Sequence, residues 1–224
     1  LVELVNADII TIHIPLTKTG PDKTLRLFDD RRICAMRPGS VLINTSRGAV
    51  VETAAIKNAL RARHLAACVL DVWENEPAID AELLSLVTLG TPHIAGYSFD
   101  GKVNGTVMIH RAACEYFGLV SSWLPHDVSG QGVGSPIVVP KNASHTAGLL
   151  AAIGSCYDIE KDDANLRRIG TLVASERGAF FRRLRAQYPM RREFCNHEME
   201  VPPEHSALVD TLEILGFKKI KVKG

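Results

Sequence analysis

The sequence has 224 residues, of which 46% are hydrophobic and 23% charged, and its formal net charge is +1. This composition is that of an ordinary globular protein, and so balanced a charge predicts neither a nucleic-acid partner nor a membrane partner. No apolar run reaches the roughly 20 residues of a membrane span, and five scattered cysteines without a CxxC pair favour a cytoplasmic protein with reduced thiols and no metal site.

Residues 1–120 alternate between strand and helix patterns. The predicted strands cover 8–15, 41–46, 66–73 and 87–95, and the predicted helices cover 29–40, 52–65, 81–86 and 99–118. Strands connected through helices lie parallel, and strands this apolar are buried on both faces. We therefore predict an α/β fold, the C-terminal part of a doubly wound, Rossmann-type domain that binds ligands beyond the carboxyl ends of its strands.

The second half of the chain has a different composition and pattern of predicted elements. Residues 121–135 are rich in Ser, Gly and Pro and are predicted to be a linker. Residues 136–224 are predicted to form a small α+β domain, with strands at 136–140, 197–201 and 218–223 and helices at 144–157, 176–188 and 204–215. So small a module with so many apolar residues is expected to complete its core by pairing, as a homodimer.

Three successive strands of the first domain end in polar residues. Arg47 follows "VLINTS", and a guanidinium there can hold a carboxylate with two hydrogen bonds or can be a plain surface charge. Asp71 and Glu76 follow the next strand in "LDVWENEP"; Asp71 can cap a turn, and Glu76 can be solvated. His93 lies near the end of the last strand, in "TPHIAGYS", and Pro92 before it is expected to hold its backbone extended.

One cation, one carboxylate and one imidazole at a single sheet edge form an acid–base site. The carboxylate would fix the tautomer of the imidazole, and the arginine would hold an anionic substrate. A lone histidine is more often structural, so the interpretation depends on Arg47, Glu76 and His93 occurring together.

The motifs "INTSRGAVVE", "LDVWENEP" and "TPHIAGYS", in this order and at these separations, resemble the D-isomer-specific 2-hydroxyacid dehydrogenase family over roughly residues 1–119. The resemblance implies catalytic roles for three residues. Arg47 would bind the substrate carboxylate and carbonyl, Glu76 would pair with His93, and His93 would exchange the proton. The cofactor NAD would carry the hydride.

The resemblance also implies binding residues. Cofactor contacts are expected at Ile14 through its backbone, at Thr45, Ser46 and Arg47, and at Asp71 and Gly96, and a substrate contact is expected at Tyr97. Residues 136–224 are similar to a C-terminal dimerisation domain that most of the family lacks, found in a branch that acts on a small phosphorylated hydroxy acid. The basic run "RRLRAQYPMRR" would help hold the substrate phosphate or would be a solvated helix face.

No G-x-G-x-x-G turn follows a strand in this sequence, and "GQGVGS" at 130–135 has the wrong spacing and lies in the linker. Because the chain opens on Leu1 inside an alternating pattern, we expect the phosphate-binding turn, the ribose-binding acid and most of a substrate domain to precede it. Two alternatives remain open: a dehydrogenase of another D-2-hydroxy acid such as phosphoglycerate, and a non-catalytic NAD-sensing dimer module.

Overall fold

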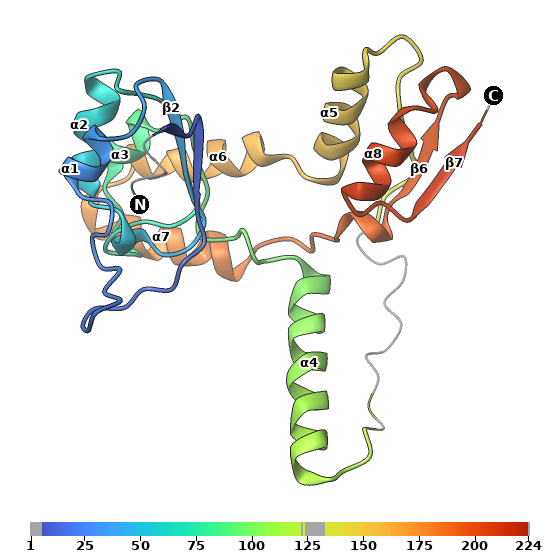
Figure 1. Cartoon of the computed structure of the whole chain (residues 1–224), viewed down its shortest axis with the longest axis horizontal. Coiled ribbons are helices and arrows are strands. Elements are labelled where there is room, and N and C mark those ends of the chain that lie inside the picture. The colour runs from blue at the N-terminus through green and yellow to red at the C-terminus, as the bar shows by residue number, and fades with distance from the viewer. Residues whose placement is uncertain (1–5, 122, 124–132, 224) are drawn as a thin grey trace. The chain divides into compact units, whose positions relative to one another are not determined.

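The computed structural model describes residues 6–121, 123 and 133–223, so most of the predicted linker lies outside the described residues. The chain divides into two compact units (Figure 1). The first comprises residues 1–95 and 159–188, and the second comprises residues 96–158 and 189–224. Each unit is described by itself.

The first unit contains a four-stranded parallel sheet in the order β1-β2-β3-β4. The strands are β1 (Ile9–Ile12), β2 (Ser40–Asn44), β3 (Leu65–Leu70) and β4 (Leu89–Gly90). Because the sheet is parallel and its order follows the chain, the carboxyl ends of β2, β3 and β4 are neighbours at one edge. This arrangement confirms the predicted α/β class.

Five helices of the first unit pack with this sheet: α1 (Asp30–Cys34), α2 (Thr53–Arg61), α3 (Ala81–Leu86), α6 (Ile159–Arg167) and α7 (Ala174–Ala186) (Figure 1). Local caps explain where the first helices start. The Asp29 carboxylate accepts from the N–H of Arg32, and the Asp80 carboxylate accepts from the N–H groups of Glu82 and Leu83. For α2 the cap comes from a distant loop, since Glu74 accepts from the N–H of Thr53 at 3.3 Å.

One hydrophobic core joins the sheet to all of these helices. Leu42 and Cys68 of the central strands are fully buried, and so are Ile33 of α1 and Leu166 of α6. Burial raises the pKa of the Cys68 thiol to about 12, so this cysteine is an inert core residue.

The second unit contains a smaller parallel sheet, β5 (Ile137–Val138), β6 (Glu198–Val201) and β7 (Lys219–Val222), in the order β5-β6-β7. Its core consists of one sheet face packed with α5 (His145–Cys156) and α8 (Leu208–Ile214). The unit also includes α4 (Phe99–Phe117), which starts at a Ser98 cap and ends at Gly118 with φ +65°. None of the described helices is both long and apolar enough to cross a bilayer.

The structure differs from the sequence prediction in three respects. The strands are shorter than predicted, and a helix that was not predicted, α6, is present. The division by contacts also differs from the predicted domain boundaries at 120 and 136. Residues 159–188, which were expected in the C-terminal domain, pack with the first unit, because Leu166, Ile169, Phe180 and Phe181 belong to its core.

Candidate active site

Arg47 directly follows β2 at the carboxyl edge of the sheet, where its side chain is exposed. The loop around it is held by the buried side chain of Asn44. The Asn44 amide oxygen accepts from the N–H and the hydroxyl of Ser46, at 3.0 and 2.9 Å, and its NH2 donates to the carbonyl oxygen of Arg47 at 3.1 Å. The arginine therefore projects from an ordered backbone, which suits the clamp predicted from the sequence.

Gly48 is required because the Arg47 loop passes directly against the loop after β3. A Cβ at Gly48 would lie 1.9 Å from the carbonyl carbon of Trp73 and 2.4 Å from the nitrogen of Glu74. Both are backbone atoms, which cannot rotate away. The loops that carry Arg47 and Glu76 are thus packed together, which explains why this cation is followed by glycine.

Glu76 and His93 form a hydrogen-bonded pair. His93 Nδ1 lies 2.7 Å from Glu76 Oε2, and both side chains are largely buried, with 28% and 20% of their surfaces exposed. The other oxygen, Glu76 Oε1, accepts from the Trp73 N–H at 2.8 Å. With Nδ1 bound to the carboxylate, Nε2 is the nitrogen that can exchange a proton with a substrate.

Asp71 is buried, with 4% exposure, and its carboxylate is used by the segment that carries His93. Oδ1 accepts from the Thr91 hydroxyl at 2.6 Å and from the Ile94 N–H at 2.7 Å, and Oδ2 accepts from the Ala95 N–H at 3.0 Å. Its carbonyl oxygen also accepts from the His93 N–H at 2.7 Å. Asp71 therefore caps the turn at residues 91–95.

The prediction of an extended backbone at His93 is wrong, since its φ is +59°, in the left-handed region. The steric restriction imposed by Pro92 acts on the residue before it, Thr91, and leaves His93 free to turn. Histidine is also one of the residue types that enter this region more often than most.

The remaining predicted residues of the first unit lie along the same edge. Ile14 follows β1 and packs against the hydrophobic core, which leaves its backbone for a cofactor contact. The Thr45 hydroxyl is 3.5 Å from His13 Nδ1, and Ser46 is buried and hydrogen-bonded to Asn44. We did not predict from the sequence that Asn44 holds the loop after β2 or that His13 lies beside Thr45. Both are polar residues at the ends of the apolar strands β1 and β2, and that position could have indicated them.

Gly96 and Tyr97 belong to the second unit, and their predicted roles stay predictions. No described atom lies within 4 Å of where a Cβ on Gly96 would be. The ammonium of Lys102 lies 3.8 Å from the centroid of the Tyr97 ring.

One arginine of the basic run, Arg192, has a partner within the second unit. Arg192 is buried in the second unit, with 3% of its side chain exposed, and it makes a two-pronged ion pair with Asp100 at 3.0 to 3.1 Å. Burial would raise the pKa of Asp100, but hydrogen bonds from Arg192 and from the Glu193 N–H outweigh it and lower the pKa. Arg192 thus has a structural partner.

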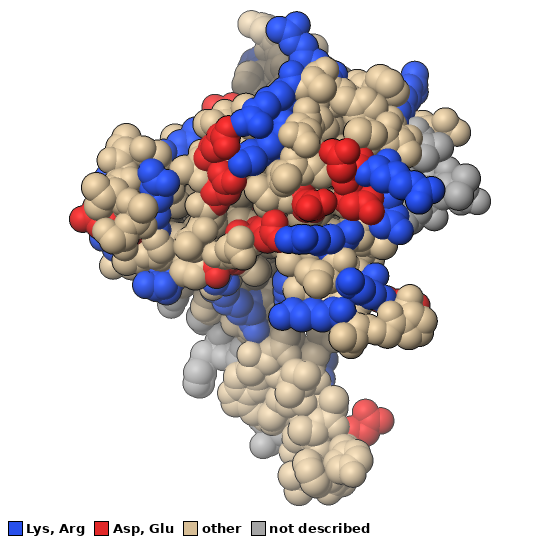
Figure 2. Space-filling view, turned by 90° about the vertical axis from the view of Figure 1, so that its left-hand side faces the viewer, with Lys and Arg blue, Asp and Glu red and all other residues tan. Residues whose placement is uncertain are grey.

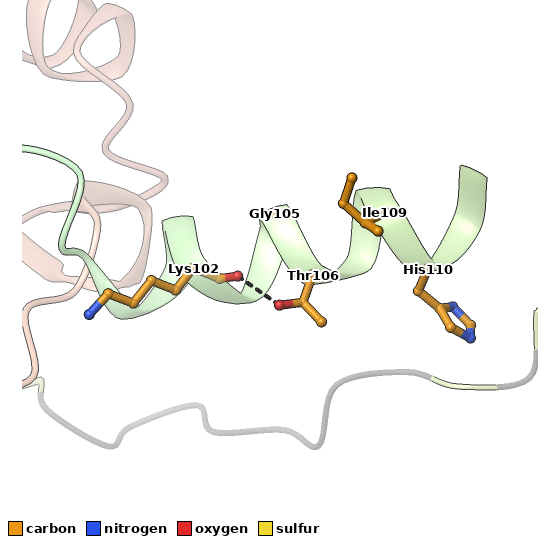
Figure 3. A pocket seen from close by; sticks show the side chains of 5 residues that line it. All are labelled: Lys102, Gly105, Thr106, Ile109 and His110. Atoms are coloured by element: carbon orange, nitrogen blue, oxygen red, sulfur yellow. Dashed lines mark hydrogen bonds between the residues drawn. The ribbon is translucent and has the colours of Figure 1, made fainter. Parts of the chain in front are cut away.

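A separate hollow runs along α4 and is lined by Lys102, Gly105, Thr106, Ile109 and His110 (Figure 3). All five residues come from one face of one helix, and the hydrogen bond drawn among them is local, from the Thr106 hydroxyl to the Lys102 carbonyl. None of them is a predicted site residue.

The chain is similar to several known proteins. Residues 3–95 match the family described as D-isomer specific 2-hydroxyacid dehydrogenase, NAD binding domain, and residues 136–216 match a domain of unknown function. A crystal structure of D-lactate dehydrogenase from Aquifex aeolicus, in complex with NAD and lactic acid, is 31% identical and covers 50% of this chain and 39% of its own, with a TM-score of 0.42.

Curated relatives match almost the whole chain. Erythronate-4-phosphate dehydrogenase from Cellvibrio japonicus is 42% identical over 97% of this chain, and the enzyme of that name from Marinobacter nauticus is 36% identical over 97%. The chain spans 58% and 57% of their lengths. The resemblance inferred from the three motifs is confirmed, because residues 3–95 match the NAD binding domain of the D-isomer specific 2-hydroxyacid dehydrogenase family.

Proposed function

We propose that this chain is the catalytic part of a dehydrogenase that oxidises 4-phospho-D-erythronate with NAD to 2-oxo-3-hydroxy-4-phosphobutanoate, in the biosynthesis of pyridoxal 5'-phosphate. The observation that carries the proposal is the 2.7 Å contact between Glu76 and His93, at the sheet edge that also bears Arg47. The relatives named erythronate-4-phosphate dehydrogenase support this substrate over other D-2-hydroxy acids.

In the proposed mechanism, Arg47 holds the substrate carboxylate and the neighbouring oxygen with its planar guanidinium. His93 Nε2 accepts the proton of the C2 hydroxyl as the alcohol becomes a carbonyl. Glu76 holds the ring through Nδ1 and stabilises the imidazolium that results, because an adjacent carboxylate favours the charged ring. Asp71 keeps the 91–95 turn, and with it His93, in place.

The cofactor would lie along the edge formed by the loops after β1 and β2. Ile14 would contact NAD through its backbone, Thr45, Ser46 and Arg47 would line the β2 side, and Asp71 would lie beside the reacting ring. When bound, NAD supplies the acceptor for the C2 hydride. Because this sequence holds no glycine-rich phosphate-binding turn, we expect the 224-residue chain alone to bind NAD poorly, and calorimetry showing micromolar affinity would contradict that expectation.

We also propose a homodimer formed through the second unit, as the sequence predicted. The apolar side chains of that unit that are exposed in the single chain include Val138, Leu150, Ile214 and Leu215. Single exposed hydrophobics are common, so the dimer needs a direct test. Sedimentation of the 224-residue chain should show a dimer that Ile214→Glu weakens, and a monomer at micromolar concentration would contradict it.

A cytoplasmic location without nucleic-acid or membrane partners completes the proposal. All five cysteines are free, as expected in a reducing compartment. Basic and acidic side chains are interspersed on the face shown in Figure 2, and pairs such as Lys57–Asp80 at 2.8 Å mix the two signs. Nucleic-acid binding proteins gather one sign of charge instead.

The test uses a longer protein, called the long form. It contains this chain together with the part of the curated relatives that this chain does not cover. It should reduce NAD with 4-phospho-D-erythronate at a kcat/KM at least tenfold above that with 3-phospho-D-glycerate. A preference for 3-phospho-D-glycerate would favour the alternative substrate, and no turnover of either compound would favour the non-catalytic alternative.

A further inference from the structure

Helices α6 and α7 are part of the unit that carries the candidate active site. They lie within residues 136–216, the segment that matches a domain with no known function. Their apolar side chains nevertheless enter the core of the first unit: Leu166 and Ile169 are fully buried, and Phe180 and Phe181 are 6% and 1% exposed. This segment therefore has a structural connection to the sheet that bears Arg47, Glu76 and His93.

Helix α6 is fixed to the strand that precedes His93. The carboxylate of Asp163 accepts from the N–H of Gly90, in β4, at 2.7 Å. Arg167 pairs with Asp163 at 2.6 Å and donates to the carbonyl oxygens of Leu84 and Val87 at 2.8 and 2.9 Å. These bonds satisfy backbone groups at the end of α3 and at the edge strand β4.

Helix α7 contacts both loops that hold the acid–base pair. A Cβ on Gly178 would lie 3.5 Å from the ring of Pro77, the residue after Glu76. Seven residues later, Arg185 Nε donates to the carbonyl oxygen of His93 at 3.3 Å. Residues seven apart lie on the same side of a helix, so one face of α7 meets the Glu76 loop and the His93 turn together.

The contact from Arg185 falls where the backbone is in an uncommon conformation. His93 has a φ of +59°, which side chains with a Cβ rarely adopt and which persists only where surrounding contacts hold it. Asp71 accepts hydrogen bonds from the N–H groups of His93, Ile94 and Ala95 in this turn. Arg185 holds the carbonyl side.

We propose that Arg185 is a positioning residue for the Glu76–His93 pair, and that one role of the domain of unknown function is to brace the active-site turn through α7. The proposal rests on the proposed function, because the pair must be catalytic for its position to affect turnover. Arg185 acts through the backbone of His93 and not on the substrate itself.

The kinetic test compares three variants of the long form. Arg185→Gln removes the charged donor and should lower kcat about tenfold, with the KM for NAD changed less than twofold, as expected for losing one hydrogen bond from a charged group. Arg185→Lys can still donate to the carbonyl and should recover most of kcat. Glu176→Gln changes an exposed residue of the same helix that lies outside the basic run, and it should leave kcat unchanged.

A second measurement does not depend on activity. In the 224-residue chain, the proton shared by His93 Nδ1 and Glu76 should give a downfield NMR resonance, and the amides of Ile94 and Ala95 should exchange slowly with solvent. Arg185→Gln should weaken the resonance and accelerate both amides, while Arg185→Lys and Glu176→Gln should not.

The outcomes separate the two proposals. If Arg185→Gln changes neither kcat nor the resonance, or if Arg185→Lys is as impaired as Arg185→Gln in both, the positioning role is overturned. If the long form turns over no substrate but the resonance and amide exchange change as expected, the brace stands and the proposed function fails.

Discussion

The two units share parallel strands joined by helices but use their polar residues differently. In the first unit, the carboxylate of Asp71 is 4% exposed and is bound by a hydroxyl and two backbone N–H groups. In the second unit, acids and lysines pair across the neighbouring strands β6 and β7. Glu198 and Lys221 are one such pair, at 3.3 Å, and their side chains are 46% and 59% exposed.

These two uses of charged side chains have different consequences for the structure. Exposed ion pairs contribute little, because solvent screens them and long side chains must be ordered to form them. Buried carboxylates that accept backbone N–H groups instead determine the positions of a few loops. Each unit has such a carboxylate, Asp71 in the first and Asp100 in the second, but Asp71 holds the turn that carries the candidate catalytic residue His93.

The largest predicted loss of activity comes from changing His93, and it tests whether the catalytic residues lie in the first unit. His93→Gln in the long form should lower kcat about 1,000-fold, because no group then exchanges the substrate proton. Steady-state kinetics with 4-phospho-D-erythronate measures this. His145→Gln changes an exposed histidine of the second unit and should have no effect; equal losses in both variants would remove the distinction.

Gly48→Ala should be the next largest change and acts on stability. Its Cβ would overlap the Trp73 backbone, so the loops after β2 and β3 must separate, at a cost of about 3 kcal/mol. Urea unfolding of the 224-residue chain measures the loss. Gly105→Ala, in the open part of α4, is the matched control and should be neutral or slightly stabilising. Equal stabilities would show that the two loops do not pack as described.

The smallest predicted effect is a pH dependence confined to the second unit. His197 is buried, its Nε2 has no hydrogen-bond partner among the described residues, and burial lowers its pKa below the ordinary value of 6.5. The unfolded chain then binds the proton more readily, so stability is present above pH 6.5 and is lost as the pH falls below it. Asp100, whose pKa is also lowered, adds a loss only in stronger acid.

Amide exchange at two pH values tests this dependence. Between pH 7.5 and 5.5 the opening free energy of Met199 and Val201 in β6 should fall, while that of Leu42 in β2 should not. His197→Leu removes the titrating group and should flatten the change in β6. A fall of the same size in the variant would assign the effect to another group.

Much of the site could be predicted from the sequence, because its residues follow apolar strands one after another. Parallel strands in chain order bring Arg47, Glu76 and His93 to one edge, and that required only the strand pattern. The three motifs supplied the family. What remained hidden were contacts between segments far apart in the chain, such as Gly48 against Trp73.

The C-terminal half was harder to predict for the same reason. Helix α6 begins among acidic residues, and its stability comes from Leu166 and Arg167, which contact residues far away in the sequence. No local pattern shows that residues 159–188 join the first unit. The turn at His93 was mispredicted because its conformation depends on Asp71 and not on its neighbour Pro92.

The most direct measurement of the central claim is Arg47→Lys in the long form, with kinetics and a thermal melt on the same protein. Lysine keeps the charge but loses the planar fork, so kcat/KM should fall about 100-fold while the melting temperature is unchanged. Near-normal activity would show that Arg47 is an ordinary surface charge. A joint loss of activity and melting temperature would show that it holds the fold, and either result would contradict the account of a substrate clamp at the end of β2.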